Sequence, residues 1–269
     1  MLTAVVIQLE GTPGTRAQLH TAAIRSWLLG RIQELCPDLL PMVAPPEPNN
    51  APVPYTISGV VPDGDGWHLR ITTLHTPLSR LLIDTILPNL PEHLTLDTQT
   101  FRVLGWTIDH AVHGRAGSTT FTQLAAEALD IAEPTTQPVF AFRLLTPACF
   151  RNKGLDFPWP EPPHFYGSLL NRWQTFSETL LPLPLAAFFE QQITVAAYQL
   201  GTRPHYEIGR LLGCTGYIRF QVKPRVASPP DERQDWLHRV RMVSMLSKFA
   251  FYAGIGAKTT FGMGQADPL

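Results

Sequence analysis

The order in which strands and helices follow one another constrains the fold of this chain more than any single motif does. Residues 16–35 carry apolar side chains at helical spacing, and Thr15 with Gln18 has the spacing of a capping box. Alternating apolar residues bounded by glycine and proline predict strands around this helix. The expected elements are a strand at 2–9, a helix at 16–35, a proline-rich loop at 41–54, strands at 53–61 and 67–74, a helix at 78–87 and a strand at 100–108. This β-α-β-β-α-β order is that of a ferredoxin-like domain.

The second half of the chain predicts the same order again. A short helix at 121–129 and a linker at 133–138 lead into it. The expected elements are then a strand at 139–145, a helix at 165–180, strands at 193–199 and 216–222 flanking an irregular stretch or extra hairpin at 201–213, a helix at 233–251 and a strand at 259–265. We therefore predict an α+β fold of two tandem ferredoxin-like (RRM-like) domains, residues 1–134 and 135–269.

Charge is distributed unevenly between these two halves. The chain of 269 residues has a net charge of −1, but the first half carries −6 and the second +5. A basic, arginine-rich half favours contact with RNA or DNA, although codon preference for arginine explains part of the bias. Three distant cysteines indicate neither a disulfide framework nor a zinc cluster, and no signal peptide or membrane-spanning run is expected. A cytoplasmic protein fits best.

A glycine-rich segment follows the last predicted helix. Four glycines (Gly254, Gly256, Gly262 and Gly264) surround Lys258, Thr259 and Thr260. Glycines let the backbone approach a ligand closely, and the lysine and hydroxyl groups suit phosphate oxygens. A nucleotide-binding P-loop is excluded, because Ala257 stands where its last glycine is required and too few residues follow for its helix. A phosphate-backbone loop and a plain sheet-closing turn remain as alternatives.

Four segments together resemble the CRISPR repeat-RNA endoribonucleases of the repeat-associated mysterious protein superfamily. They are Phe142 to Phe150 with its Thr-Pro turn, Gly167 to Trp173, Thr215 to Phe220, and the glycine-rich segment Gly254 to Gly264. The resemblance covers about residues 140–265. It is weaker over 1–135, where Pro54-Tyr55-Thr56-Ile57-Ser58 gives the best match.

This resemblance implies two ferredoxin-like domains facing each other across a cleft, and cleavage of precursor crRNA once within each repeat. It implies a reaction without metal or cofactor, in which a 2′-hydroxyl attacks its own phosphate and leaves a 2′,3′-cyclic phosphate and a 5′-hydroxyl. The expected partner is CRISPR repeat RNA, with other CRISPR effector subunits and a second copy of the chain as further candidates. The alternative is a subunit that binds the repeat in an effector complex and cuts slowly or not at all.

Histidine is the usual general acid or base of this family, on or just after the first helix. We predict His20 as catalytic and His205 as the alternative, while residues 36–55 contain no histidine. Asp109, His110 and His113 have a spacing that zinc ligands can use, but no further ligand is evident and we predict no metal site. The predicted RNA-binding residues are Arg16, Arg151, Lys153, Arg172, Gly256, Lys258, Thr259, Thr260 and Gly262.

Overall fold

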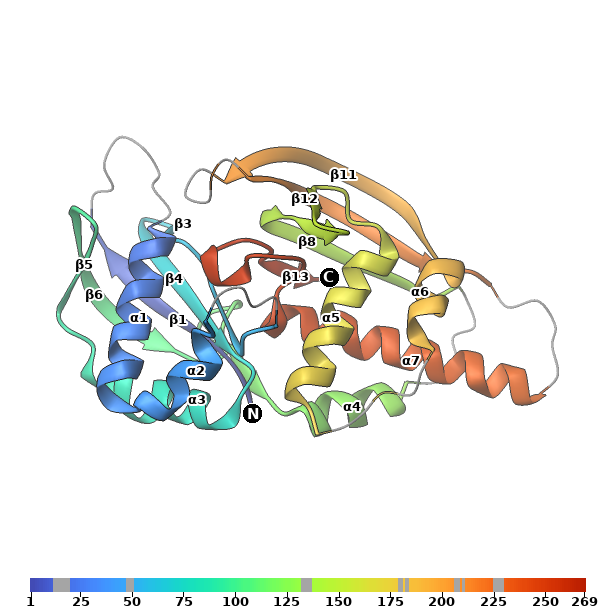
Figure 1. Cartoon of the computed structure of the whole chain (residues 1–269), viewed down its shortest axis with the longest axis horizontal. Coiled ribbons are helices and arrows are strands. Elements are labelled where there is room, and N and C mark those ends of the chain that lie inside the picture. Colours follow the sequence, from blue (N-terminus) through green and yellow to red (C-terminus); the bar gives the residue numbers. More distant parts are fainter. Residues whose placement is uncertain are drawn as a thin grey trace. The chain divides into compact units, whose positions relative to one another are not determined.

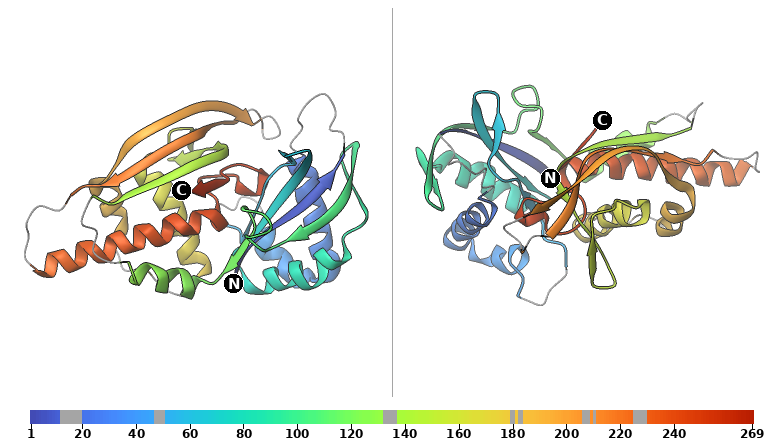
Figure 2. Two further views of the ribbon diagram at one scale, coloured as in Figure 1. Left: turned by 180° about the vertical axis from the view of Figure 1, so that it is seen from behind. Right: turned by 90° about the horizontal axis from the view of Figure 1, so that it is seen from above.

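The computed structural model of the chain consists of two compact units (Figures 1 and 2). It describes all residues except 12–19, 47–50, 132–136, 179–180, 182–183, 206–208, 210 and 225–229. Unit 1 comprises Met1–Thr119 and Thr259–Gly262, and unit 2 comprises Thr120–Lys258 and Met263–Leu269. The division therefore precedes the predicted boundary at residue 134, and four residues of the glycine-rich segment belong to unit 1. No described helix combines the length and apolarity needed to cross a bilayer.

Unit 1 is a twisted antiparallel sheet with helices on one face. Its central strand β1 pairs with β4 on one side, from Thr3 opposite Thr73 to Leu9 opposite Trp67, and with β6 on the other. The path β2-β4-β1-β6-β5 contains the strand order of a ferredoxin-like domain, with β5 added at one edge. The elements are β1 (Leu2–Glu10), α1 (Thr21–Leu35), α2 (Leu40–Val43), β2 (Tyr55–Ile57), β3 (Val61–Asp63), β4 (Gly66–Thr73), α3 (Thr76–Arg80), β5 (His93–Leu96), β6 (Gln99–Thr107) and β7 (Gly117–Thr119).

Unit 2 repeats this plan with a four-stranded sheet. Strand β12 pairs with β11 and β8, and β13 completes the order β11-β12-β8-β13. Helices α5 and α7 lie on the same side of this sheet (Figure 1). The elements are α4 (Phe121–Leu129), β8 (Val139–Ala148), β9 (Phe150–Asn152), β10 (Leu155–Phe157), α5 (Pro162–Phe176), α6 (Leu185–Gln192), β11 (Ile193–His205), β12 (Leu211–Val222), α7 (Pro230–Ala253) and β13 (Ala266–Pro268).

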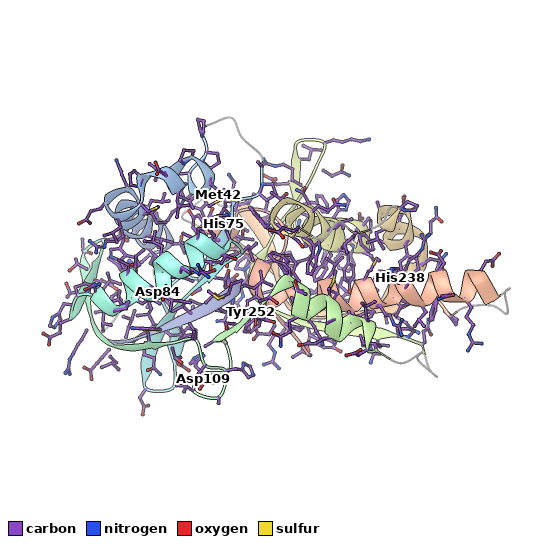
Figure 3. All side chains as sticks on the ribbon, turned by 90° about the horizontal axis from the view of Figure 1, so that it is seen from below. Met42, His75, Asp84, Asp109, His238 and Tyr252 are labelled. Carbon is purple, nitrogen blue, oxygen red and sulfur yellow. The ribbon has the colours of Figure 1, made fainter. Side chains whose placement is uncertain are left out.

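The sequence pattern explains why these elements form. On α7 the predicted apolar stripe is buried at Val240, Val243, Leu246 and Ala250, because the helical period places these side chains on one face. Figure 3 labels His238 and Tyr252 on the same helix. The α+β fold class is confirmed, and α4 spans the predicted residues 121–129.

Several predicted elements differ from the structure. The expected strand at 53–61 is split into β2 and β3, and α2 forms inside the predicted loop 41–54. Within 201–213, predicted as an irregular stretch or extra hairpin, Gly201–His205 belong to β11 and Leu211–Gly213 to β12. The last strand was predicted at 259–265, but Thr259–Phe261 forms a 3-10 turn and the strand begins at Ala266. Glycines with positive φ at 262 and 264 interrupt the extended backbone that a strand needs.

Candidate RNA-binding site

Four glycines give the segment after α7 its shape. Gly254, Gly256, Gly262 and Gly264 have φ values of 63°, 72°, 83° and 67°, all in the left-handed region that favours glycine. A Cβ atom added to Gly256 would overlap the carbonyl oxygen of Cys149, and one added to Gly264 would overlap that of Ile255. Gly256 and Gly264 therefore allow close approach to the chain's own backbone, while close approach to a ligand stays a prediction.

Helix α5 holds this loop from within unit 2. The Arg172 Nη2 atom donates a hydrogen bond to the Gly256 carbonyl at 2.7 Å, and the Gly256 N–H donates to Ser168 Oγ at 3.1 Å. The Ala257 N–H donates to the Cys149 carbonyl at 2.7 Å. Arg172 is 8% exposed, and burial lowers its pKa to about 10. Arg172, predicted as an RNA contact, thus has the geometry of a residue that positions the loop.

The predicted basic residues of unit 2 lie on two adjacent features. Arg151 belongs to the hairpin of β9 and β10, where its Nε and Nη2 atoms bind the Asp156 carboxylate at 2.7 and 2.9 Å. Lys153 occupies the exposed turn of this hairpin with φ 48°. Arg151 holds the pKa of Asp156 below its usual range, and the charge of Lys258 in the glycine-rich loop acts in the same direction. Lys258 therefore lies near enough to the hairpin for its charge to act on Asp156.

The segment Thr259–Gly262 contributes to unit 1 instead. The Phe261 ring lies under the Arg25 guanidinium, 4.9 Å from ring centroid to Cζ, which is a cation–π contact. A Cβ atom on Gly262 would overlap the Thr21 methyl group on α1. Thr259 is buried and Thr260 is half-buried. Arg25 was not among the predicted residues, because its partner Phe261 lies 236 positions further along the chain.

His20 is buried at the start of α1. Its Nδ1 atom lies 2.8 Å from Asp97 Oδ2 and its Nε2 atom 2.9 Å from Gln99 Oε1, and the residue is 2% exposed. Its backbone is left-handed, with φ 52°. Both ring nitrogens are therefore occupied by partners within unit 1. Its predicted neighbour Arg16 lies outside the described residues.

His205, the alternative, closes β11 opposite Leu211 and is 1% exposed. His205 therefore ends a strand of the unit 2 sheet with its side chain buried.

Known proteins share both the segments and the fold. The family model for CRISPR-associated endoribonuclease Cas6 matches residues 142–266. A product complex of Cas6 from Thermus thermophilus has a TM-score of 0.79 and 25% identity, covering 100% of this chain and 99% of that one. The Cas6 family of CRISPR-associated endoribonucleases is therefore the family that this chain resembles, in sequence over residues 142–266 and in fold over its whole length.

Other Cas6 proteins extend this comparison. A Cas6 of Mycobacterium tuberculosis (strain CDC 1551 / Oshkosh) is 28% identical over 145 residues, 51% of this chain and 41% of the relative. The match therefore spans about two fifths of that curated relative. A second Cas6 product complex has a TM-score of 0.78 and 25% identity, covering 100% of this chain and 99% of that one.

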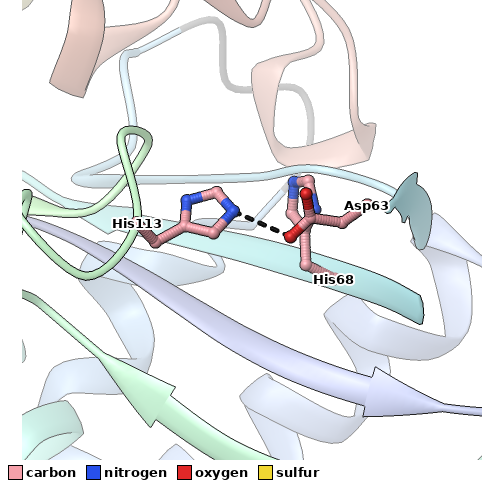
Figure 4. Close-up of side chains that lie close together, drawn as sticks. All are labelled: Asp63, His68 and His113. Atoms are coloured by element: carbon pink, nitrogen blue, oxygen red, sulfur yellow. Dashed lines mark hydrogen bonds and ion pairs between the residues drawn. The ribbon is translucent and has the colours of Figure 1, made fainter. Parts of the chain in front are cut away.

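A cluster of two histidines and a carboxylate lies on unit 1. Asp63, His68 and His113 place their ligand atoms within 4.8 Å of one another (Figure 4). His113 Nε2 lies 3.0 Å from Asp63 Oδ2, and His68 Nδ1 lies 3.6 Å from the same oxygen. In the sequence, the spacing of Asp109, His110 and His113 made these three residues the candidates for a zinc site. Instead Asp109 Oδ1 accepts from the Ala111 N–H, while the partners of His113 come from the hairpin of β3 and β4.

The hydrogen bonds of this cluster do not fit a bound metal. The Arg115 N–H donates to His113 Nδ1 at 3.1 Å, and Arg115 Nη1 donates to His68 Nε2 at 3.3 Å. A histidine that binds a metal through one nitrogen carries its proton on the other, which then needs an acceptor. Here the nitrogens that do not face Asp63, Nδ1 of His113 and Nε2 of His68, both accept hydrogen bonds from Arg115. The cluster therefore joins the β3–β4 hairpin to the loop after β6 through hydrogen bonds.

Proposed function

We propose that this chain binds CRISPR repeat RNA and cuts precursor crRNA within each repeat. The observation that carries the proposal is the glycine-rich loop, which is held by Arg172 and carries the exposed Lys258, whose charge acts on Asp156 in the hairpin that also bears Arg151 and Lys153. Such an arrangement offers cations and loop backbone to a phosphate chain. Relatives of the same fold were solved as a product complex and as a substrate-mimic complex, which supports a nucleolytic role.

The proposed reaction is a transesterification that needs no metal. The 2′-hydroxyl attacks the adjacent phosphorus and the bond to the 5′-oxygen breaks, which leaves a 2′,3′-cyclic phosphate and a 5′-hydroxyl. One group accepts the proton of the 2′-hydroxyl, another donates a proton to the leaving oxygen, and cations stabilise the charge on the phosphate. Lys258 is our candidate for such a cation, and His20 remains our candidate for proton transfer.

A specific observation favours a second candidate function, repeat binding without cleavage. His20 is buried with both ring nitrogens hydrogen-bonded, and no histidine occurs at 36–55. To transfer a proton, His20 would have to release Asp97 or Gln99. A subunit that holds the repeat within an effector complex needs no such movement.

One assay separates the two functions. Repeat RNA from the chain's own CRISPR array is incubated with the protein, with and without EDTA. His20→Asn is compared with the wild type, because asparagine tolerates the left-handed backbone of His20 but transfers no proton at neutral pH. A single cut that resists EDTA and is lost by at least about 100-fold in the variant supports the catalytic proposal.

The other outcomes are equally distinct. Tight binding by the wild type without any cut favours the holding function. Equal cutting by His20→Asn removes His20 from the mechanism. Cutting that EDTA abolishes contradicts the metal-free reaction. Lys258→Ala, which lies outside the His20 network, should weaken binding and lower its salt dependence. Unchanged melting temperatures of both variants show that neither result reflects unfolding.

A further inference from the structure

The described helices of unit 2 lie on one face of its sheet and leave the other face uncovered by helices. Phe142 on β8 and Ile218 and Phe220 on β12 are buried toward α5, where Phe142 and Phe220 contact Phe165. Figure 1 shows α5, α6 and α7 on that side of β8, β11 and β12. Because side chains alternate along a strand, the neighbours of these residues point to the opposite face. That face carries Arg143 and Arg219, both exposed.

The strand register places an aromatic ring among these arginines. Arg143 on β8 lies opposite Tyr217 on the central strand β12, and Tyr217 lies opposite Gln199 on β11. Arg219 follows two residues after Tyr217 and so shares its face. Arg203 lies four residues after Gln199 along the regular part of β11, on the same face. We call Arg143, Arg203, Tyr217 and Arg219 the open sheet face.

The open sheet face carries three arginines. None of its three arginines forms an ion pair in the part of the chain that the structure describes. The carboxylate nearest in register is Asp267, opposite Arg143 on β13. Arg203 lies opposite Gly213 on β12, six residues before Arg219 on the same strand. At about 3.3 Å per residue, the two arginines are therefore separated by about 20 Å along the strands. This is room for several nucleotides.

We infer that the open sheet face binds a single-stranded segment of the RNA, with a base stacked on Tyr217 and phosphates bound by Arg143, Arg203 and Arg219. Four-stranded sheets of this order stack bases on aromatic side chains of their central strands, and arginine pairs with phosphate. The inference rests on the proposed function but concerns residues other than the glycine-rich loop. A protein partner is less suited, because the three arginines surround an aromatic ring that can stack on a base.

Binding of repeat RNA is measured by fluorescence anisotropy over a range of salt concentrations. We expect Arg143→Ala with Arg219→Ala to raise the Kd about tenfold and to reduce the slope of log K against log salt by about 1.4, since each lost contact to a single strand contributes about 0.7. Tyr217→Leu should raise the Kd about tenfold, and Tyr217→Phe, which keeps the ring, should not. Arg239→Ala is the matched control, because α7 lies on the other side of the sheet.

Ultraviolet crosslinking followed by mass spectrometry provides a readout that loss of stability would not produce. A crosslink from repeat RNA to Tyr217 in the wild type supports the inference. If the double arginine variant binds repeat RNA as tightly as the wild type and no crosslink forms at Tyr217, the inference about the open sheet face is wrong. If the protein still cuts the repeat in that case, the proposed function stands. Failure of the wild type to bind repeat RNA overturns both.

Discussion

Gly264 has a backbone conformation that other residues tolerate poorly. Its φ is 67°, and an added Cβ would overlap the Ile255 carbonyl oxygen, while the Ile255 N–H donates to the Gly264 carbonyl at 2.9 Å. Gly264→Ala should therefore lower the free energy of unfolding by about 2 kcal/mol or more. Urea denaturation of the purified variant measures this change.

Gly167 provides the control for this prediction. It lies within α5, and an added Cβ would meet nothing within 4 Å. Gly167→Ala should raise the free energy of unfolding by about 0.5–1 kcal/mol, because alanine loses less backbone entropy in a helix. Similar effects of the two substitutions would show that the glycine-rich loop is not conformationally demanding.

The buried His68 should make the free energy of unfolding depend on pH. Burial and the nearby Arg115 cation lower its pKa from about 6.5 to about 4. Between these two values the unfolded chain binds a proton that the folded chain does not, so stability falls as pH falls through this window. The contribution is complete above about pH 6.5 and amounts to about 3 kcal/mol.

Thermal unfolding between pH 4 and pH 7 tests this contribution. Asp63, His113, Arg70 and Arg115 surround His68 and act on its charge, so they are left unchanged. His68→Gln removes the titrating group and should flatten the pH dependence in this window. An equally steep decline in the variant would assign the dependence to other groups.

Sequence reasoning located some site residues and missed others for physical reasons. Local composition was enough to identify Lys258 and the glycines, because glycine density is visible along the chain. The contacts of the predicted residue His20 could not be foreseen, since Asp97 and Gln99 lie 77 and 79 positions away. The same holds for Arg25 under Phe261. Which polar side chains are buried depends on contacts between residues far apart in the sequence, and a local sequence pattern does not predict these contacts.

At the level of elements, long periodic segments were predicted best. The stripe on α7 and the strands β1, β6 and β8 follow from apolar spacing alone. The hairpin of β9 and β10 was missed because its two strands have three residues each and are mostly exposed. Such a hairpin lacks the alternation that marks a half-buried strand. It nevertheless supplies Arg151 and Lys153, so a short element carries part of the proposed binding surface.

Across the whole molecule, the repeated element order predicted the repeated topology. Both units contain the strand order in which the first strand lies between the third and the fourth. The sequence halves share no visible repeat, so the likeness is one of architecture. The order of elements did not predict that a segment near the C-terminal end of the sequence would contribute to unit 1.

The last eleven residues contribute to both units. Thr259–Gly262 belongs to unit 1, with Phe261 under Arg25 and Gly262 against Thr21. Met263–Leu269 belongs to unit 2, where β13 pairs with β8 and the Leu145 N–H donates to the Gln265 carbonyl at 2.9 Å. Removing residues 259–269 should therefore destabilise both units at once.

Hydrogen exchange measures this effect separately in each unit. Protection should fall in α1 and β2 of unit 1 and in β8 of unit 2, because the deletion removes packing from the first and a paired edge strand from the second. Removing Leu269 alone is the control, since it deletes only the hydrogen bond from its N–H to the Ala141 carbonyl at the end of β13. Loss of protection confined to unit 2 would contradict the prediction, because Thr259–Gly262 would then add nothing measurable to the stability of unit 1.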